Sequence, residues 1–181
     1  EIKLDGSYTP KKKIIIKSFF YTEEKNKFNI KQLLLNKDLT INRINEINLD
    51  YFDQDLRENK LRIRKSKNNI YEVIGSKFNA NNLIKNFTES KKNDTNIFVE
   101  NIELNIQLDQ VFLDKENVIK NLNGNLIYKK NEIVDAEIDA IFSKKEKLKL
   151  TIKTNDSEKV TTLFLDQAEP IVKRFEFIKG F

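Results

Sequence analysis

Apolar and polar residues alternate along most of the chain, with the two-residue period of strands that have one face covered and one in water. The pattern is clearest in three segments, at about 102–108, 136–140 and 148–152, where charged or polar residues separate the apolar ones. The apolar positions are Ile102, Leu104, Ile106, Leu108, Ala136, Ile138, Ala140, Leu148, Leu150 and Ile152. We expect each of the three segments to be a strand with one apolar side.

The same reading predicts further strands and the turns between them. Asp5-Gly6-Ser7 and Asn123-Gly124 are turn signals, because glycine and asparagine accept the backbone angles of tight turns. Ile41 and Ile44 break the two-residue parity, which predicts a bulge or a turn near residues 43–45. The short spacing of the strands favours antiparallel meanders over βαβ units.

A similar eight-residue motif occurs twice, at 80–87 and at 168–175. Both copies have apolar residues at the i, i+3, i+4 and i+7 spacing of one helix face. Each copy follows a stretch of strand-like sequence. We therefore predict two short helices, at about 80–88 and 166–175, and two β blocks, 1–90 and 91–181, within one elongated, repeat-like assembly. The polar segment 90–95 is the expected boundary.

These elements predict a mainly β fold, an antiparallel sheet that is twisted and curved. Two short helices are too small to cover the apolar side of so many strands. The sheet then closes into a barrel, packs on a second sheet, or curls into an open groove that holds an apolar guest.

Composition excludes several chemistries. The 181 residues include no His, Cys, Met or Trp, which removes Ser-His-Asp and Cys-His catalysis and the usual zinc sites. A hydroxyl–lysine or two-carboxylate site remains open, but we expect Asp53 with Asp55, and Asp135 with Asp139, to be solvent-facing charges. We predict no catalytic residue, no metal and no cofactor.

Charge adds little. The formal net charge is +5, but acidic residues lie evenly among the basic ones, so we do not expect nucleic-acid binding. The lysines at 11–13 with Lys17 suit a solvated strand edge better than a phosphate contact. No apolar run approaches the ~20 residues that span a bilayer as a helix. The start at Glu1 and the end in an apolar-rich run favour a piece of a longer chain.

The segment 97–181 resembles the AsmA-like superfamily, in particular the large YhdP-type proteins of Gram-negative envelopes. The resemblance rests on FVENIELNIQLDQVFL, on NLNGNLIYKKNEIVDAEIDAIF, and on the last strand pair with its turn and helix entry at Asp166-Gln167-Ala168 and exit at 177–180. The upstream IYEVIGSKFNANNLIKNF is similar. Gln167 and Glu169 depart from the small residues of that family.

The resemblance implies an open β-groove in a periplasmic protein that is anchored to the inner membrane, through a segment outside this chain. It further implies a non-catalytic, bridge-like role in moving phospholipids between the inner and outer membranes. The ten apolar positions above are then the predicted contacts for phospholipid acyl chains. Two alternatives remain open: a structural or assembly module of the cell envelope that binds a protein partner, and, more weakly, a hydrolase.

Overall fold

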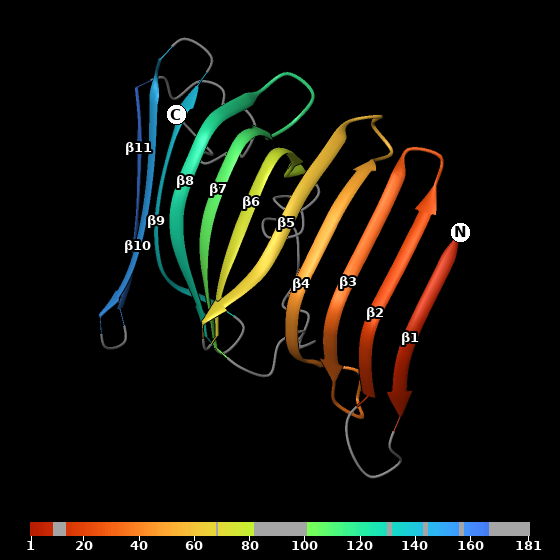
Figure 1. The fold of residues 1–181 in the computed structure, drawn as a ribbon. Coiled ribbons are helices and arrows are strands. Elements are labelled where there is room, and N and C mark those ends of the chain that lie inside the picture. Colours follow the sequence, from red (N-terminus) through yellow and green to blue (C-terminus); the bar gives the residue numbers. More distant parts are fainter. Residues whose placement is uncertain are drawn as a thin grey trace.

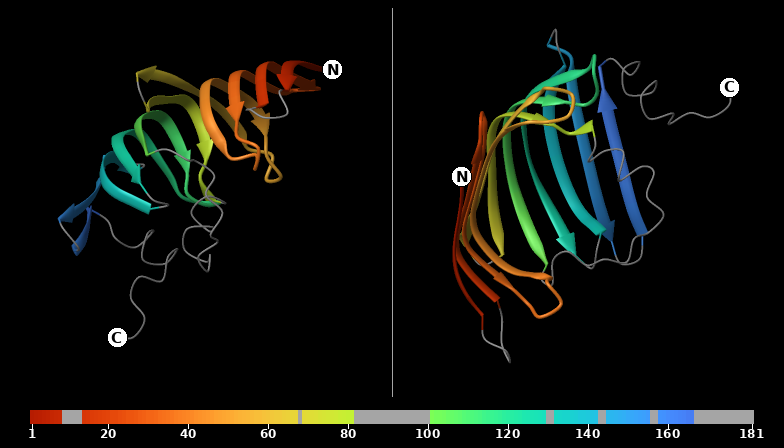
Figure 2. Two further views of the ribbon diagram at one scale, coloured as in Figure 1. Left: turned by 90° about the horizontal axis from the view of Figure 1, so that it is seen from below. Right: turned by 90° about the vertical axis from the view of Figure 1, so that its right-hand side faces the viewer.

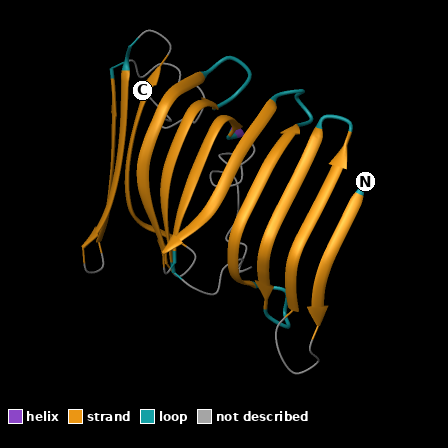
Figure 3. Ribbon diagram, viewed as in Figure 1, coloured by secondary structure: helices purple, strands orange, loops and turns teal. Residues whose placement is uncertain are grey.

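The described part of the protein is a single open sheet of eleven strands, arranged in the order of the sequence (Figure 1). The computed structural model describes residues 1–8, 14–67, 69–81, 101–129, 132–142, 145–155 and 158–166. The strands are β1 (Ile2–Tyr8), β2 (Ile14–Glu23), β3 (Asn26–Leu35), β4 (Ile41–Phe52), β5 (Glu58–Lys67), β6 (Ile70–Asn79), β7 (Ile102–Phe112), β8 (Val118–Lys129), β9 (Glu132–Phe142), β10 (Lys147–Asn155) and β11 (Glu158–Leu165). The mainly β fold class is confirmed, and strands dominate the described chain (Figure 3).

Nine of the ten strand pairs are antiparallel, and β6 with β7 is parallel. This pair joins two antiparallel meanders, β1–β6 and β7–β11. Two parallel neighbours begin at the same end of the sheet, so β6 ends at the opposite end from the one where β7 begins. The alternation of apolar and polar residues does not predict this parallel pair, because the pairing depends on where the connection between β6 and β7 leads.

The sheet is strongly bowed along its strands, so it has a convex and a concave side (Figure 2). Right-handed twist and coiling give open sheets of this size such a shape. β1 and β11 do not pair with each other, so the described strands form no closed barrel. The strands also belong to one sheet, so no second sheet packs on it within the described part of the chain.

The predicted helices and the predicted boundary lie almost entirely outside the described residues. Of 80–88 only Ala80 and Asn81 are described, and of 166–175 only Asp166. The boundary between residues 90 and 91 falls in the undescribed segment 82–100.

The strand positions repeat along the chain with the same offset as the eight-residue motif at 80–87 and 168–175. β2 begins at residue 14 and β7 at residue 102, and β6 begins at residue 70 and β11 at residue 158; both offsets are 88 residues. The three strands between them follow the same order. The five strands β2–β6 therefore correspond to the five strands β7–β11, and β1 stands outside this pattern.

The two predicted turns at glycine are wrong, because both glycines lie inside strands. Gly124 lies in β8, where an added Cβ would come within 2.5 Å of the Glu137 carbonyl oxygen and 2.9 Å of the Ile138 Cα on β9. Gly6 lies in β1 at a register shift, with the Ile15 carbonyl oxygen 2.8 Å from such a Cβ. At both positions glycine allows the neighbouring backbone to approach closely, rather than forming a turn.

The parity change predicted near residues 43–45 is confirmed as a register shift between β3 and β4. Leu34 pairs with Arg43, but Leu35 pairs with Ile41. The shift keeps Ile41 and Ile44 on the same side of β4, where Ile44 is buried. The bulge therefore keeps both isoleucines on one face, whereas strict alternation would place them on opposite faces.

Candidate functional site

The candidate site is the apolar face of the sheet, and its centre is a row of residues that pair with one another across all eleven strands. Residues directly opposite in a sheet share a face. We call this set the central row: Leu4, Phe19, Ile30, Ile47, Ile63, Val73, Ile106, Gly124, Ile138, Leu150 and Leu163. Ten members are apolar and the eleventh is glycine. At ~4.8 Å between strands, the row is about 48 Å long.

A second row runs beside the central row over eight strands. Its members are Ile2, Tyr21, Phe28, Leu49, Leu61, Gly75, Leu108 and Leu122. The Phe28 ring contacts the rings of Tyr21 and Tyr51, with centroids 5.9 and 5.4 Å apart. The apolar face is therefore a band several residues wide.

All ten apolar positions predicted from the sequence lie on this face. Strand pairing through β8 links Leu104 of β7 to Ala136 of β9, which pairs with Ile152 of β10. Ile106 is linked in the same way to Ile138 and Leu150. The remaining four, Ile102, Leu108, Ala140 and Leu148, have the same parity on their strands.

Burial divides these ten residues into two groups. Four are half-buried: Leu104, Ile106, Ile138 and Leu150. The other six are less than a tenth exposed: Ile102, Leu108, Ala136, Ala140, Leu148 and Ile152. Toward the two edges of the sheet the face opens, and Leu4 and Leu163 of the central row are 65% and 38% exposed. The accessible part of the face thus includes the half-buried residues and the edge strands.

The prediction from sequence missed the first half of this face. β1–β6 contribute six of the eleven members of the central row, although only β7, β9 and β10 supplied predicted residues. Alternation at Phe28 and Ile30, and at Leu61 and Ile63, is a usable signal for these strands. The register shifts in β1, β3–β4 and β6 hide it, because each one changes the parity within a strand.

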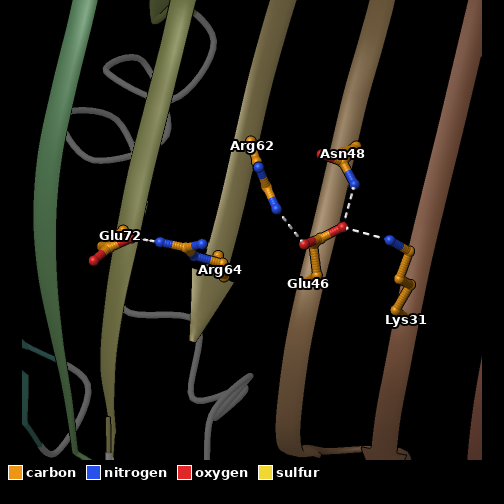
Figure 4. A network of polar contacts seen from close by, with 6 residues as sticks. All are labelled: Lys31, Glu46, Asn48, Arg62, Arg64 and Glu72. Carbon is orange, nitrogen blue, oxygen red and sulfur yellow. Dashed lines mark hydrogen bonds and ion pairs between the residues drawn. The ribbon is translucent and has the colours of Figure 1, made fainter. Parts of the chain in front are cut away.

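The opposite face carries charged pairs, and its main feature is a network around Glu46 (Figure 4). Lys31 Nζ donates to Glu46 Oε1 at 2.9 Å, Arg62 Nη2 donates to Oε2 at 2.7 Å, and Asn48 Nδ2 donates to Oε1 at 2.9 Å. These hydrogen bonds, first from Lys31 and then from Arg62 and Asn48, lower the pKa of Glu46 to about 2. The carboxylate stays ionised between two cations.

Further ion pairs cross from strand to strand on this polar face. Arg64 Nη2 lies 2.6 Å from Glu72 Oε2, and Lys149 Nζ lies 2.7 Å from Glu137 Oε1. Figures 1 and 4 show strands β3 to β6 in the same order and direction, and the sheet bows toward the viewer of Figure 1. The charged face is therefore the convex one, and the apolar face lines the concave side.

The polar face also has hollows. One of about 820 Å³ is bordered by polar and charged side chains, among them Lys31, Arg43, Glu46 and Arg64. A hydrocarbon chain has no favourable contacts in such a lining. We therefore do not assign the candidate site to it.

Two of the four carboxylates considered for catalysis, Asp53 and Asp135, make polar contacts, and Asp53 is half-buried rather than solvent-facing. Asp53 Oδ1 accepts hydrogen bonds from the backbone N–H groups of Asp55 and Arg57, and Asp53 Oδ2 accepts from Asn59 and Asn79. Burial alone would raise the pKa of Asp53, but these bonds outweigh it and the pKa lies below its usual value. Asp135 pairs with Lys153 at 3.0 Å. Among the described residues no three acidic side chains are grouped as a metal site.

No helix among the described residues has the length and apolar character needed to cross a bilayer. Comparison with known protein families, with curated proteins and with solved structures found no match.

Proposed function

We propose that the concave apolar face binds the acyl chains of phospholipids, as one section of a bridge-like lipid transport protein. The observation that carries this proposal is the central row, which stays apolar, or glycine, across every strand from β1 to β11. A row of this length along the sheet is a continuous path for hydrocarbon. The polar convex face keeps the other side in water.

The free-energy cost of exposing hydrocarbon to water explains what such a path would do. Exposing an acyl chain to water costs ~0.8 kcal/mol per methylene, so two long chains cost on the order of 20 kcal/mol. A continuous apolar face removes most of that cost along its whole length, while a charged headgroup can remain in solvent. The role requires no catalysis, and its lipid partners need only be amphipathic.

By the resemblance of the sequence, the setting would be the periplasm of a Gram-negative bacterium. The protein would be anchored to the inner membrane through another segment and would carry phospholipid toward the outer membrane. An open sheet suits this setting, because further strands at either edge would lengthen the path by about 4.8 Å each.

A structural or assembly module of the cell envelope is the second candidate. The observation in its favour is the burial of six of the ten predicted residues, which is typical of a packed interior. In that case the half-buried residues would complete a dry core, and partner proteins would bind elsewhere on the sheet.

Lipid retention by paired variants separates the two candidates. Leu150→Asp places a charge on the central row, and Thr151→Asp places the same charge one residue away on the polar face. We expect phospholipid to co-purify with the wild type and with Thr151→Asp, and several-fold less with Leu150→Asp, by mass spectrometry of extracted lipid. Leu163→Asp and Phe164→Asp form a second matched pair at exposed positions, where folding is at little risk.

Absence of phospholipid from every preparation, with no uptake from added vesicles, would reject the lipid proposal. Equal retention by all four variants would reject it as well, because the bound lipid would then not lie on the apolar face. Thermal unfolding of each variant shows whether a loss of lipid follows from a loss of fold.

A further inference from the structure

The second edge of the sheet, strand β11, is open to pairing. Among the described residues β11 pairs only with β10, and nearly all of its residues are exposed. Val160, Leu163 and Phe164 are 51%, 38% and 55% exposed. By contrast β6, its counterpart in the first five-strand set, is mostly half-buried between two neighbours.

The hydrogen-bonding groups of this edge can be assigned from the pairing. The Asp166 N–H donates to the Lys147 carbonyl oxygen at 3.1 Å, so residue 166 faces β10 with its backbone. Backbone groups alternate in direction along a strand, and the β10–β11 register has no shift. Lys159, Thr161, Leu163 and Leu165 therefore direct their N–H and C=O groups away from β10.

β11 has few of the devices that usually protect an edge strand. Lysine, proline and bulges discourage pairing with other chains. The eight residues of β11 include no proline, and their two charges, Glu158 and Lys159, lie together at its start. β1, at the other edge, has Lys3 and Asp5 in its middle and a register shift beside Gly6. The two edges thus differ, and β11 has fewer features that discourage strand pairing than β1.

The internal correspondence shows what such an edge accepts. β6 corresponds to β11 with an offset of 88 residues, and the second edge of β6 carries β7 as a parallel strand. Gly75 of β6 pairs with Leu108 of β7, and Leu163 is the residue of β11 at the same offset. Gly75 and Leu163 both lie on the apolar face, so the parity of the two strands agrees.

We propose that the edge of β11 opposite β10 binds a β-strand of a partner polypeptide in parallel orientation, in the register that β6 uses for β7. The partner strand has apolar residues at alternate positions, and these continue the apolar face beyond Leu163 and Leu165. Strand addition of this kind obtains affinity from main-chain hydrogen bonds and selectivity from the alternating side chains. It is independent of whether the apolar face holds lipid.

A peptide of this chain's own β7, residues 102–112, is the probe for the test. Fluorescence anisotropy measures its binding to the purified protein. Thr161→Pro removes an outward N–H and leaves the hydrogen bonds to β10, whereas Thr161→Val keeps the N–H and the branched side chain. We expect binding to the wild type and to Thr161→Val, and affinity lower by about tenfold, or 1.4 kcal/mol, for Thr161→Pro.

A second peptide with aspartate in place of Ile106 and Leu108 should bind at least as weakly as the first binds Thr161→Pro. No binding of the β7 peptide, or equal binding to all three proteins, would overturn the proposal. Self-association that Thr161→Pro abolishes and the peptide does not inhibit would assign the edge to a second copy, and would also overturn it. Lipid retention is also measured on Thr161→Pro. It shows whether the lipid proposal fails, independently of whether the strand-binding proposal fails.

Discussion

At the scale of single residues, polar side chains hold the sheet together at two places. Glu46 lies between Lys31 and Arg62 on the convex face and accepts from both. Asn59 is fully buried at the start of β5, beside the turn that connects β4 to β5. Both use nearly all their hydrogen-bonding capacity, so replacing either one leaves its partners without a hydrogen bond.

Replacing Glu46 by glutamine tests the first of these places. A depressed pKa means that the ionised carboxylate stabilises the fold above the ordinary value of 4.5, and that this stabilisation is lost as pH falls toward about 2. We expect Glu46→Gln to lower the free energy of unfolding by about 1–2 kcal/mol at pH 7. Denaturant unfolding at several pH values should show the difference from the wild type shrinking below pH 4.5.

The control for this measurement is Glu116→Gln, at an exposed position, with an expected change within about 0.5 kcal/mol. A constant difference between wild type and Glu46→Gln down to pH 2 would contradict the role given to the carboxylate charge.

Replacing Asn59 by alanine tests the second place. Its Nδ2 donates to the Arg57 carbonyl oxygen at 3.0 Å, and its Oδ1 accepts from the Asn79 N–H at 2.7 Å. Loss of both leaves buried polar groups unsatisfied, so we expect a loss of about 2–3 kcal/mol in unfolding free energy. Asn123→Ala, at an exposed position, should be near neutral. Similar values for the two variants would refute this reading of Asn59.

At the scale of strands, the apolar face could be predicted from the sequence wherever the local alternation of apolar and polar residues is unbroken. The segments 102–108, 136–140 and 148–152 of β7, β9 and β10 follow a strict two-residue period, and all ten of their predicted apolar residues share one face. The prediction failed at Gly6 and Gly124, because the same residue serves turns and close strand contacts and only the neighbouring strand distinguishes them. The parallel β6–β7 pair was also missed, because sequence spacing does not reveal where a connection returns.

Gly124→Ala tests the close contact between β8 and β9. The added methyl group would meet the Glu137 carbonyl oxygen and the Ile138 backbone, which have no free side-chain end that could move aside. We expect a loss of about 1–3 kcal/mol in the free energy of unfolding, measured with urea. Lys120→Ala on the same strand is the control and should change little. An unchanged Gly124→Ala would show that the two strands are farther apart than described.

At the scale of the whole molecule, two five-strand sets and one additional strand make a sheet with one charged and one apolar side. The apolar side continues through the parallel pair at the junction of the two sets, because Val73 and Ile106 are paired there. The class of fold and the face of the predicted residues followed from the sequence. The continuity of that face did not, because it depends on the register of ten strand pairs.

The most direct test of the lipid proposal is photo-cross-linking with a phospholipid that carries a diazirine in an acyl chain. After irradiation with the purified protein, mass spectrometry of peptides locates the adducts. We predict adducts on apolar-face residues of several strands, including Leu4, Ile106, Leu150 and Leu163, and none at Glu46 or Arg62 on the opposite face. Adducts confined to the charged face, or no adducts above those of an unrelated control protein, would contradict the proposal.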